Sequence, residues 1–266
     1  MLKAILFALI SATVLAAIAA WRRALTKGGL LLAWALAVAI AFCGGWAGFL
    51  ALAATFAFTV AAGKLSGKKR EQAEQSLHLK TGARDAMQIF CNVFVGTLAL
   101  LLWQLTAYRG FLWAYGGAMA ASLADSMASE LGVLSKRPPR DILTMKPVEA
   151  GLSGGVTALG FAMSALGAAL IALVFALPED GPGFGAFLDV TAAGFFAAVC
   201  DSALGSGVQV KYRCPECGKL TEKPVHCAVP GTPERGFAFM TNDAVNLCNN
   251  LLGALAALGL YAIHHP

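Results

Sequence analysis

Hydrophobic residues follow one another along this chain in long runs and do not alternate with polar ones. The runs at 4–20, 30–43 and 156–177 approach or reach the roughly 20 residues that a helix needs to cross a bilayer. We therefore predict an all-α, polytopic membrane bundle that forms a single domain over residues 1–266. About eight transmembrane helices are expected, at 4–20, 29–43, 45–62, 86–106, 110–130, 152–177, 184–207 and 242–262.

The polar stretches between these runs predict the connections. Gly44 and Gly45 predict a tight hairpin between the second and third spans, and the Lys-rich stretch 63–82 predicts a short surface segment. The stretch 211–241 is the largest hydrophilic insertion. Further apolar segments follow the first run at once, so we expect that run to be a retained helix and not a cleaved signal.

Composition and charge narrow the class of protein. Hydrophobic residues make up 58% of the chain, charged residues 13%, and the mean hydropathy is +0.68, which excludes an ordinary soluble protein. All Lys and Arg residues except Lys3 and Arg109 fall in alternate loops. Because basic loops stay in the cytoplasm, we predict a plasma-membrane protein with both termini outside and the large loops cytoplasmic. The net charge of +5 suits lipid head groups or phosphates, and no nucleic-acid-binding pattern is present.

Polar side chains gather at the predicted cytoplasmic ends of four spans. They recur every three or four residues, which places each set on one helical face. Such groups are costly at membrane depth unless they face a partner or a wet cavity, so they mark a candidate site. The candidate residues of this kind are Arg84, Gln88, Asn92, Asp125, Ser126, Ser129, Glu130, Asp201, Ser202, Asn242, Asp243 and Asn246.

Three carboxylates from three spans have the chemistry of a magnesium site. Asp125, Asp201 and Asp243 offer hard oxygen ligands, and Mg²⁺ is commonly held by one or two carboxylates together with substrate phosphates. Glu130 lies one helical turn after Ser126 and is a further catalytic candidate. The alternatives are that the acids pair with loop lysines, that Asn242 or Asp243 caps a helix, and that the amides bond neighbouring helices.

A glycine-rich stretch at the start of the sixth span has the character of a phosphate site. Ser153, Gly154, Gly155 and Thr157 would present backbone N–H groups and hydroxyls at a helix N-terminus, with Lys146 close by in sequence. Arg84 could hold a second phosphate through its guanidinium. Glycines equally serve turns and close packing, and Arg84 could instead extend to lipid head groups.

The insertion at 211–241 carries a pattern typical of a metal site. Cys214 and Cys217 form a CxxC motif, and His226 and Cys227 follow. In a reducing cytoplasmic loop, four nitrogen and sulfur ligands favour a structural Zn²⁺ over a disulfide. Only one CxxC is present and the second ligand pair is adjacent, so the zinc assignment is a hypothesis.

Several of these segments together resemble a known family. The stretches that carry the resemblance are Thr81–Asn92, Ala124–Gly132, Lys146–Thr157, Asp201–Gly205 and Asn242–Asn246. In that order they are similar to the integral-membrane family of domain of unknown function 92, and more weakly to polyprenol kinases and CDP-diacylglycerol synthases. The resemblance implies that a γ-phosphoryl group passes from a nucleoside triphosphate, CTP above all, to an isoprenyl or phytyl monophosphate.

The residues and the resemblance lead to one hypothesis with two alternatives. We expect Asp125, Asp201 and Asp243 to hold Mg²⁺, and Lys146 with Gly154 and Gly155 to bind the donor phosphates. Arg84 or a loop lysine would neutralise the acceptor phosphate. A nucleotidyltransferase that forms a CDP-activated lipid, or a lipid or small-molecule transporter, would use a similar chamber. The sequence does not predict the oligomeric state.

Overall fold

The computed structural model describes residues 2–77, 82–176 and 183–265, without the side chains of 71–76, and this part of the chain is mostly helical. Its helices are α1 (Leu2–Trp21), α2 (Lys27–Leu77), α3 (Ala86–Thr106), α4 (Gly110–Gly132), α5 (Ala158–Ala176), α6 (Gly183–Gly207) and α7 (Asn242–His264). All of them except α4 are long and apolar enough to cross a membrane. The prediction of a polytopic helical membrane protein is confirmed.

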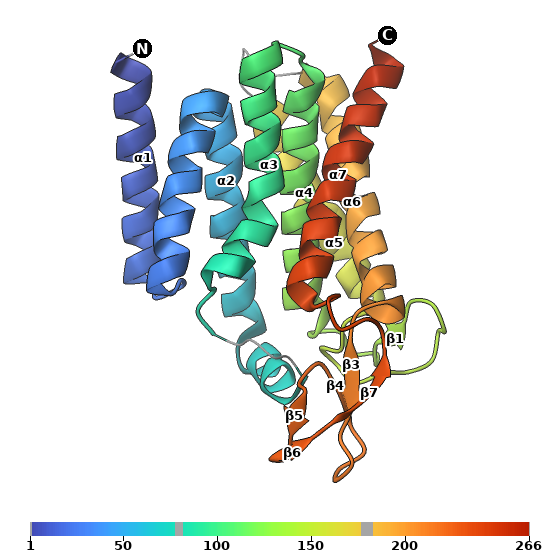
Figure 1. The fold of residues 1–266 in the computed structure, drawn as a ribbon. Helices are drawn as coiled ribbons and strands as arrows, with labels where there is room; N and C mark the ends of the chain where they lie inside the picture. Colours follow the sequence, from blue (N-terminus) through green and yellow to red (C-terminus); the bar gives the residue numbers. More distant parts are fainter. Residues whose placement is uncertain (1, 78–81, 177–182, 266) are drawn as a thin grey trace.

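Helix α2 contains the predicted hairpin. At Gly45 the backbone leaves the helical region (φ 57°, ψ −147°), and a Cβ on Gly48 would lie 3.4 Å from the carbonyl oxygen of Ile40. Those two residues would be about 12 Å apart along an unbroken helix. The chain therefore folds back at Gly45, and α2 supplies two of the predicted spans as two limbs (Figure 1).

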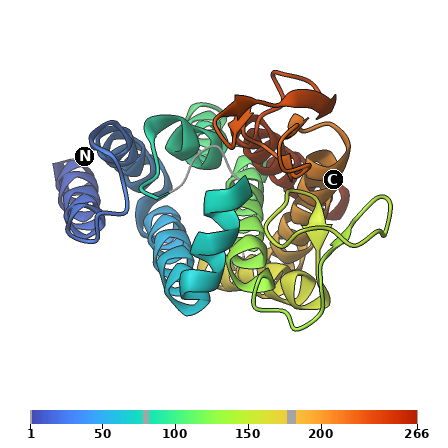
Figure 2. The ribbon, with the colours of Figure 1, turned by 90° about the horizontal axis from the view of Figure 1, so that it is seen from below.

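A second break ends the membrane-length part of α2. Gly67 has φ 51° and ψ −136°, and the helix then continues to Leu77 across the loop end of the bundle (Figure 2). This segment is the predicted polar surface stretch, of which residues 78–81 lie outside the described part. Its end is held by the insertion, because the backbone N–H of Glu222 and the hydroxyl of Thr221 both donate to the carbonyl of Leu77, at 2.9 Å each.

Helix α4 is the central element of the bundle. It packs against the other helices from α2 to α7 and buries most of its residues. Small residues allow this close packing. At the crossing of α4 and α7, a Cβ on Gly253 would lie only 2.5 Å from the carbonyl oxygen of Gly117. The two backbones therefore touch where α4 and α7 cross.

The loops contain short strands, so the all-α prediction needs a correction. Strands β1 (Arg140–Asp141) and β2 (Gly155–Val156) pair antiparallel. In the insertion, β3 (Lys211–Arg213) lies between β4 (Leu220–Thr221) and β7 (Thr232–Arg235), and β5 (Val225–His226) pairs with β6 (Val229–Pro230). The predicted helix start at residue 152 is wrong, since α5 begins at Ala158. Gly154 has φ 86°, a conformation that an α-helix does not contain. The chain therefore turns at Gly154, where the apolar pattern alone predicts that the helix continues.

Both described ends of the chain lie at one end of the bundle, and the large loops lie at the other (Figure 1). This arrangement matches the alternation of basic and non-basic loops in the sequence. We refer to the two ends as the terminal end and the loop end. The assignment of the loop end to the cytoplasm rests on the positions of Lys and Arg and stays a prediction.

Candidate functional site

A cavity of about 640 Å³ opens at the loop end of the bundle, between the ends of α3, α4, α6 and α7 and the loops. We call it the polar chamber. Most of the candidate residues, although far apart in sequence, line it. They are Arg84, Gln88, Asn92, Asp125, Ser126, Ser129, Glu130, Ser153, Gly154, Gly155, Thr157, Asp201, Ser202, Asn242 and Asn246.

Two candidate residues do not line the chamber. Lys146 is exposed in the loop after β1, and its backbone carbonyl accepts a hydrogen bond from the Asp141 N–H at 2.9 Å. Asp243 lies in the first turn of α7, between Asn242 and Asn246, which both line the chamber. Asp243 lies about 60° around α7 from Asn246, at the flank of the face that Asn242 and Asn246 present to the chamber. Among the described residues, the cations that line the chamber are Arg70, Arg84, Lys136 and Arg137.

Two carboxylates from different helices lie close together in the chamber. Asp201 on α6 and Asp125 on α4 interact electrostatically. The Oδ2 atom of Asp201 is buried and has no hydrogen-bond partner among the described residues. A buried carboxylate oxygen without a donor is costly, and it indicates a place where a ligand completes the site.

Glu130 is held by the loop end of α2. The Ser66 hydroxyl donates to Glu130 Oε2 at 3.1 Å, and Arg70 Nε lies 3.9 Å from the same oxygen. Arg70 also donates to the carbonyl of Ser129 at 3.0 Å. Arg70 therefore fixes the position of α2 against the end of α4 and brings a positive charge to the chamber wall.

The backbone around Arg84 is fixed by the turn between α1 and α2. The N–H of Arg84 donates to Ala24 O and its carbonyl accepts from Thr26 N–H, at 3.0 Å each. Next in sequence, Asp85 and Gln88 form a reciprocal capping box at the start of α3, with bonds of 2.9 and 3.0 Å. The amide oxygen of Gln88 thus has a structural partner, and the whole arrangement aims the start of α3 at the chamber.

The glycine-rich turn is held by α6 and the insertion. Gly154 packs against Ser206 so closely that any side chain would collide with it. Lys211 Nζ donates to Ser153 O at 2.6 Å, and the Ser153 hydroxyl donates to Glu222. Thr157 accepts from the Gly160 N–H at 2.9 Å and so caps α5. The hydroxyls of Ser153 and Thr157 therefore serve the fold, while the turn itself forms part of the chamber wall.

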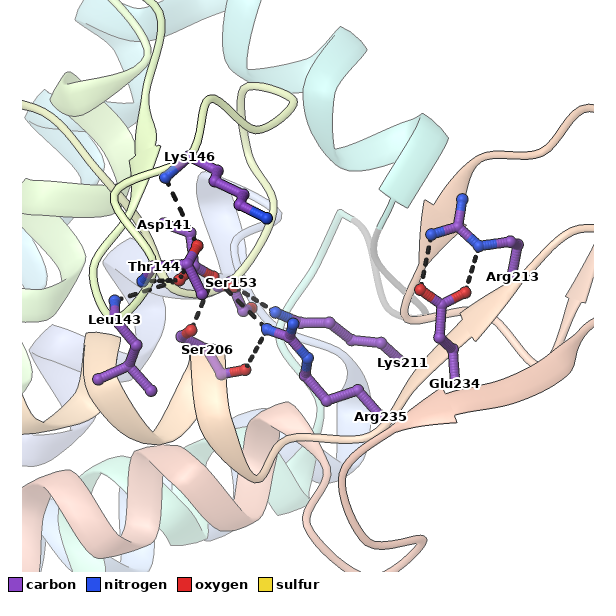
Figure 3. A network of polar contacts seen from close by, with 10 residues as sticks. All are labelled: Asp141, Leu143, Thr144, Lys146, Ser153, Ser206, Lys211, Arg213, Glu234 and Arg235. Carbon is purple, nitrogen blue, oxygen red and sulfur yellow. Dashed lines mark hydrogen bonds and ion pairs between the residues drawn. The ribbon is translucent and has the colours of Figure 1, made fainter.

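Asp141 organises the loop beside this turn and is missing from the sequence-based candidates (Figure 3). Its carboxylate accepts from Leu143 N at 3.1 Å, Thr144 N at 2.8 Å and the Ser206 hydroxyl at 2.7 Å. Arg235 lies 3.7 Å away. Burial alone would raise the pKa of Asp141, but the hydrogen bonds from Ser206, Thr144 and Leu143 outweigh it and hold the pKa below its usual value. An Asp followed three residues later by Thr is a turn signal that could have identified it.

The cysteine-containing insertion brings its four candidate ligands together. The ligand atoms of Cys214, Cys217, His226 and Cys227 all lie within 4.8 Å of one another. The β3–β4 hairpin supplies the first two and the β5–β6 hairpin the others. A hydrogen bond from the Cys217 backbone lowers the pKa of the Cys214 thiol to about 6 and so favours the thiolate that binds metals. This Cys₃His cluster can coordinate a metal ion such as zinc.

The bundle and its chamber define a polytopic membrane protein whose polar site lies at one end of the bundle. The comparison with protein families makes the assignment specific: the chain belongs to the integral membrane protein family DUF92, whose model matches residues 10–254. No solved structure matches the chain.

Three proteins from different organisms are similar to this chain. A Synechocystis protein named as an uncharacterized membrane protein is 28% identical over 93% of this chain and 86% of its own length. Protein PGR of Arabidopsis thaliana is 26% identical over 79% of this chain and 84% of its own length. A membrane protein of Methanocaldococcus jannaschii, also named as uncharacterized, is 36% identical over 43% of this chain and 49% of its own length.

Proposed function

We propose that this protein is a phosphotransferase of the plasma membrane whose polar chamber faces the cytoplasm. It moves the γ-phosphoryl group of a nucleoside triphosphate, CTP in preference, to an isoprenyl or phytyl monophosphate and yields the diphosphate. The observation that carries the proposal is the convergence of Asp125 and Asp201 with four cationic side chains in one cavity at the end of a membrane bundle. Carboxylates for a divalent cation and guanidinium groups for phosphates are the two requirements of phosphoryl transfer.

The chemistry of the chamber fits Mg²⁺. Asp201 offers a buried carboxylate oxygen without a hydrogen-bond partner among the described residues, and Asp125 lies beside it. Asp125 and Asp201 line the chamber and would hold the ion, with the amides of Asn242 and Asn246 facing the same space. Asp243, in the first turn of α7, stays a candidate third ligand. The bound ion would neutralise charge on the transferred phosphoryl group.

The remaining roles follow from charge and position. Arg84, which lines the chamber just before α3, binds the acceptor monophosphate, and Lys136 and Arg137 bind the donor phosphates in place of Lys146. The Gly154–Gly155 turn contributes backbone N–H groups. The acceptor is itself a phosphate and therefore a competent nucleophile, so the chamber needs no strong general base. Catalysis then consists of positioning and charge neutralisation.

We further propose that the Cys₃His cluster holds a structural Zn²⁺. Cys214 directly follows β3, and the first residue of β3, Lys211, is hydrogen-bonded to Ser153. Glu222 directly follows β4 and is hydrogen-bonded to the same serine. A metal that fixes the two hairpins would thereby hold one wall of the chamber in place.

The decisive experiment supplies purified protein with geranylgeranyl or phytyl monophosphate, Mg²⁺ and each nucleoside triphosphate in turn, and analyses the lipid by mass spectrometry. We expect the lipid diphosphate, in greatest amount with CTP, and its loss in Asp201→Asn. Glu149→Gln is the matched control, because Glu149 is an exposed acid at the same end of the molecule that does not line the chamber. A CDP-linked product would indicate a nucleotidyltransferase. Folded protein that forms no product with any nucleotide would refute the proposal.

A further inference from the structure

A second cavity, of about 270 Å³, lies between α1, α2 and α3. We call it the apolar groove. Its walls consist mostly of hydrocarbon, from Leu15 on α1, Trp34, Phe56 and Val60 on α2, and Val93 on α3. Several lining positions on α1 and α2 are alanines, and these small side chains leave the space between the helices open.

The apolar groove and the polar chamber meet. Gly82, Arg84, Asn92 and Glu130 line both cavities. A molecule with an anionic head and a hydrocarbon chain therefore finds a cation at the junction, polar groups on one side of it and an apolar channel on the other. A lipid phosphate has this division of polarity, whereas a free nucleotide or a soluble sugar phosphate does not.

We infer that the apolar groove holds the hydrocarbon chain of the lipid phosphate whose head group lies at Arg84. This inference rests on the proposed function and assigns the acceptor to a defined part of the bundle. On α1 the lining runs from Ala19 to Ala12, which corresponds to a depth of about 10 Å. The groove thus takes the part of the chain nearest the phosphate, and a longer chain continues into the bilayer.

The position of α1 gives the lipid a way in. α1 packs against α2 and stands at the edge of the bundle in both views (Figures 1 and 2). A hydrogen bond of 3.1 Å from Trp34 Nε1 to the Thr13 hydroxyl ties it to α2. Because α1 is the outer wall of the groove, a lipid can enter sideways from the membrane without passing through water.

The test is photo-crosslinking with geranylgeranyl monophosphate that carries a diazirine on its chain, with the labelled residues mapped by mass spectrometry. We expect labels within 12–19 and 52–60. In Ala16→Phe the phenyl ring fills the groove and should lower this labelling by about tenfold. Ala17→Phe is the matched control, because Ala17 is exposed and does not line the groove, and its labelling should stay at the wild-type level.

The outcomes separate this inference from the proposed function. Labelling of α5 and α6, or labelling spread evenly over the outer surface, overturns the groove assignment even if phosphoryl transfer is observed. Labelling confined to the groove without any phosphoryl transfer supports the groove assignment and refutes the proposed kinase activity. If Ala16→Phe fails to fold, the map on the wild-type protein alone decides the question.

Discussion

The contact between α4 and α7 makes a sharp prediction about stability. Both helices line the polar chamber, and they touch at Gly117 and Gly253. In Gly253→Ala the new Cβ would lie 2.5 Å from the Gly117 carbonyl oxygen and 2.7 Å from the Cβ of Ala121. Both neighbours are parts of α4 that cannot rotate away, so the helices would have to separate by about 1 Å to restore ordinary contact.

The size of the effect follows from two opposing terms. Overpacking of a tight core costs about 1–3 kcal/mol and occasionally more. The better helix propensity of alanine returns up to about 1 kcal/mol. Because the clash involves backbone, we expect the free energy of unfolding to fall by about 2 kcal/mol, at the upper end of the difference between these two terms. Gly259→Ala on the same helix is the matched control, since its Cβ would meet nothing within 4 Å. That variant should be unchanged or slightly more stable.

The assay is unfolding of the purified protein in mixed micelles by increasing SDS, followed by tryptophan fluorescence. Gly253→Ala should unfold at a clearly lower SDS fraction than the wild type, and Gly259→Ala should not. Equal stability of the two variants would refute the close crossing of α4 and α7.

Three further predictions concern other parts of the molecule. We expect elemental analysis to find about one zinc ion per chain in the wild type. Cys217→Ser should lose this zinc, while Cys248→Ser, outside the cluster, should keep it. Burial lowers the pKa of Lys211 to about 8, against about 10.4 in an unfolded chain. The buried charge therefore reduces the free energy of unfolding by up to about 3 kcal/mol below pH 8, and this loss is relieved as the pH rises towards 10. The β3 amides should therefore exchange more slowly, relative to their intrinsic rates, as the pH rises over that interval. Unchanged protection from exchange, or the same gain in protection in Lys211→Met, would contradict the assignment. His264→Ala should lower stability by up to about 1 kcal/mol, because His264 lies 3.1 Å from the buried carboxylate of Asp189; the loss should vanish in an Asp189→Asn background.

The sequence predicts the helices and the chamber because both follow from local patterns. Apolar runs of membrane length give the spans, and polar residues at spacings of three and four give the helical faces that line the cavity. The hairpin at Gly45 could be predicted because two glycines interrupt an apolar run. The Cys₃His cluster could be predicted because its ligands lie close together in sequence.

The structure differs from the sequence-based expectations where contacts between distant segments decide. Lys146 was chosen for its closeness in sequence to the glycine-rich turn, but the β1–β2 pairing leaves it outside the chamber. Asp243 was chosen as an acid, and only the fold shows that its neighbours Asn242 and Asn246 line the cavity. Arg70 could not be distinguished from other loop cations, because its role depends on the fold-back of α2 against Glu130. Asp141 was missed because its partners Ser206 and Arg235 lie far away in the chain.

The most direct test of the central claim is to determine which part of CTP is transferred to the lipid. Protein in lipid nanodiscs is given Mg²⁺, a prenyl monophosphate and CTP that is labelled either in the γ-phosphate or in the base. The account predicts that only the γ-label enters the lipid, and that Asp201→Asn lowers the rate by about two to three orders of magnitude while Glu149→Gln does not. Base label in the lipid, or full activity in Asp201→Asn, would contradict it.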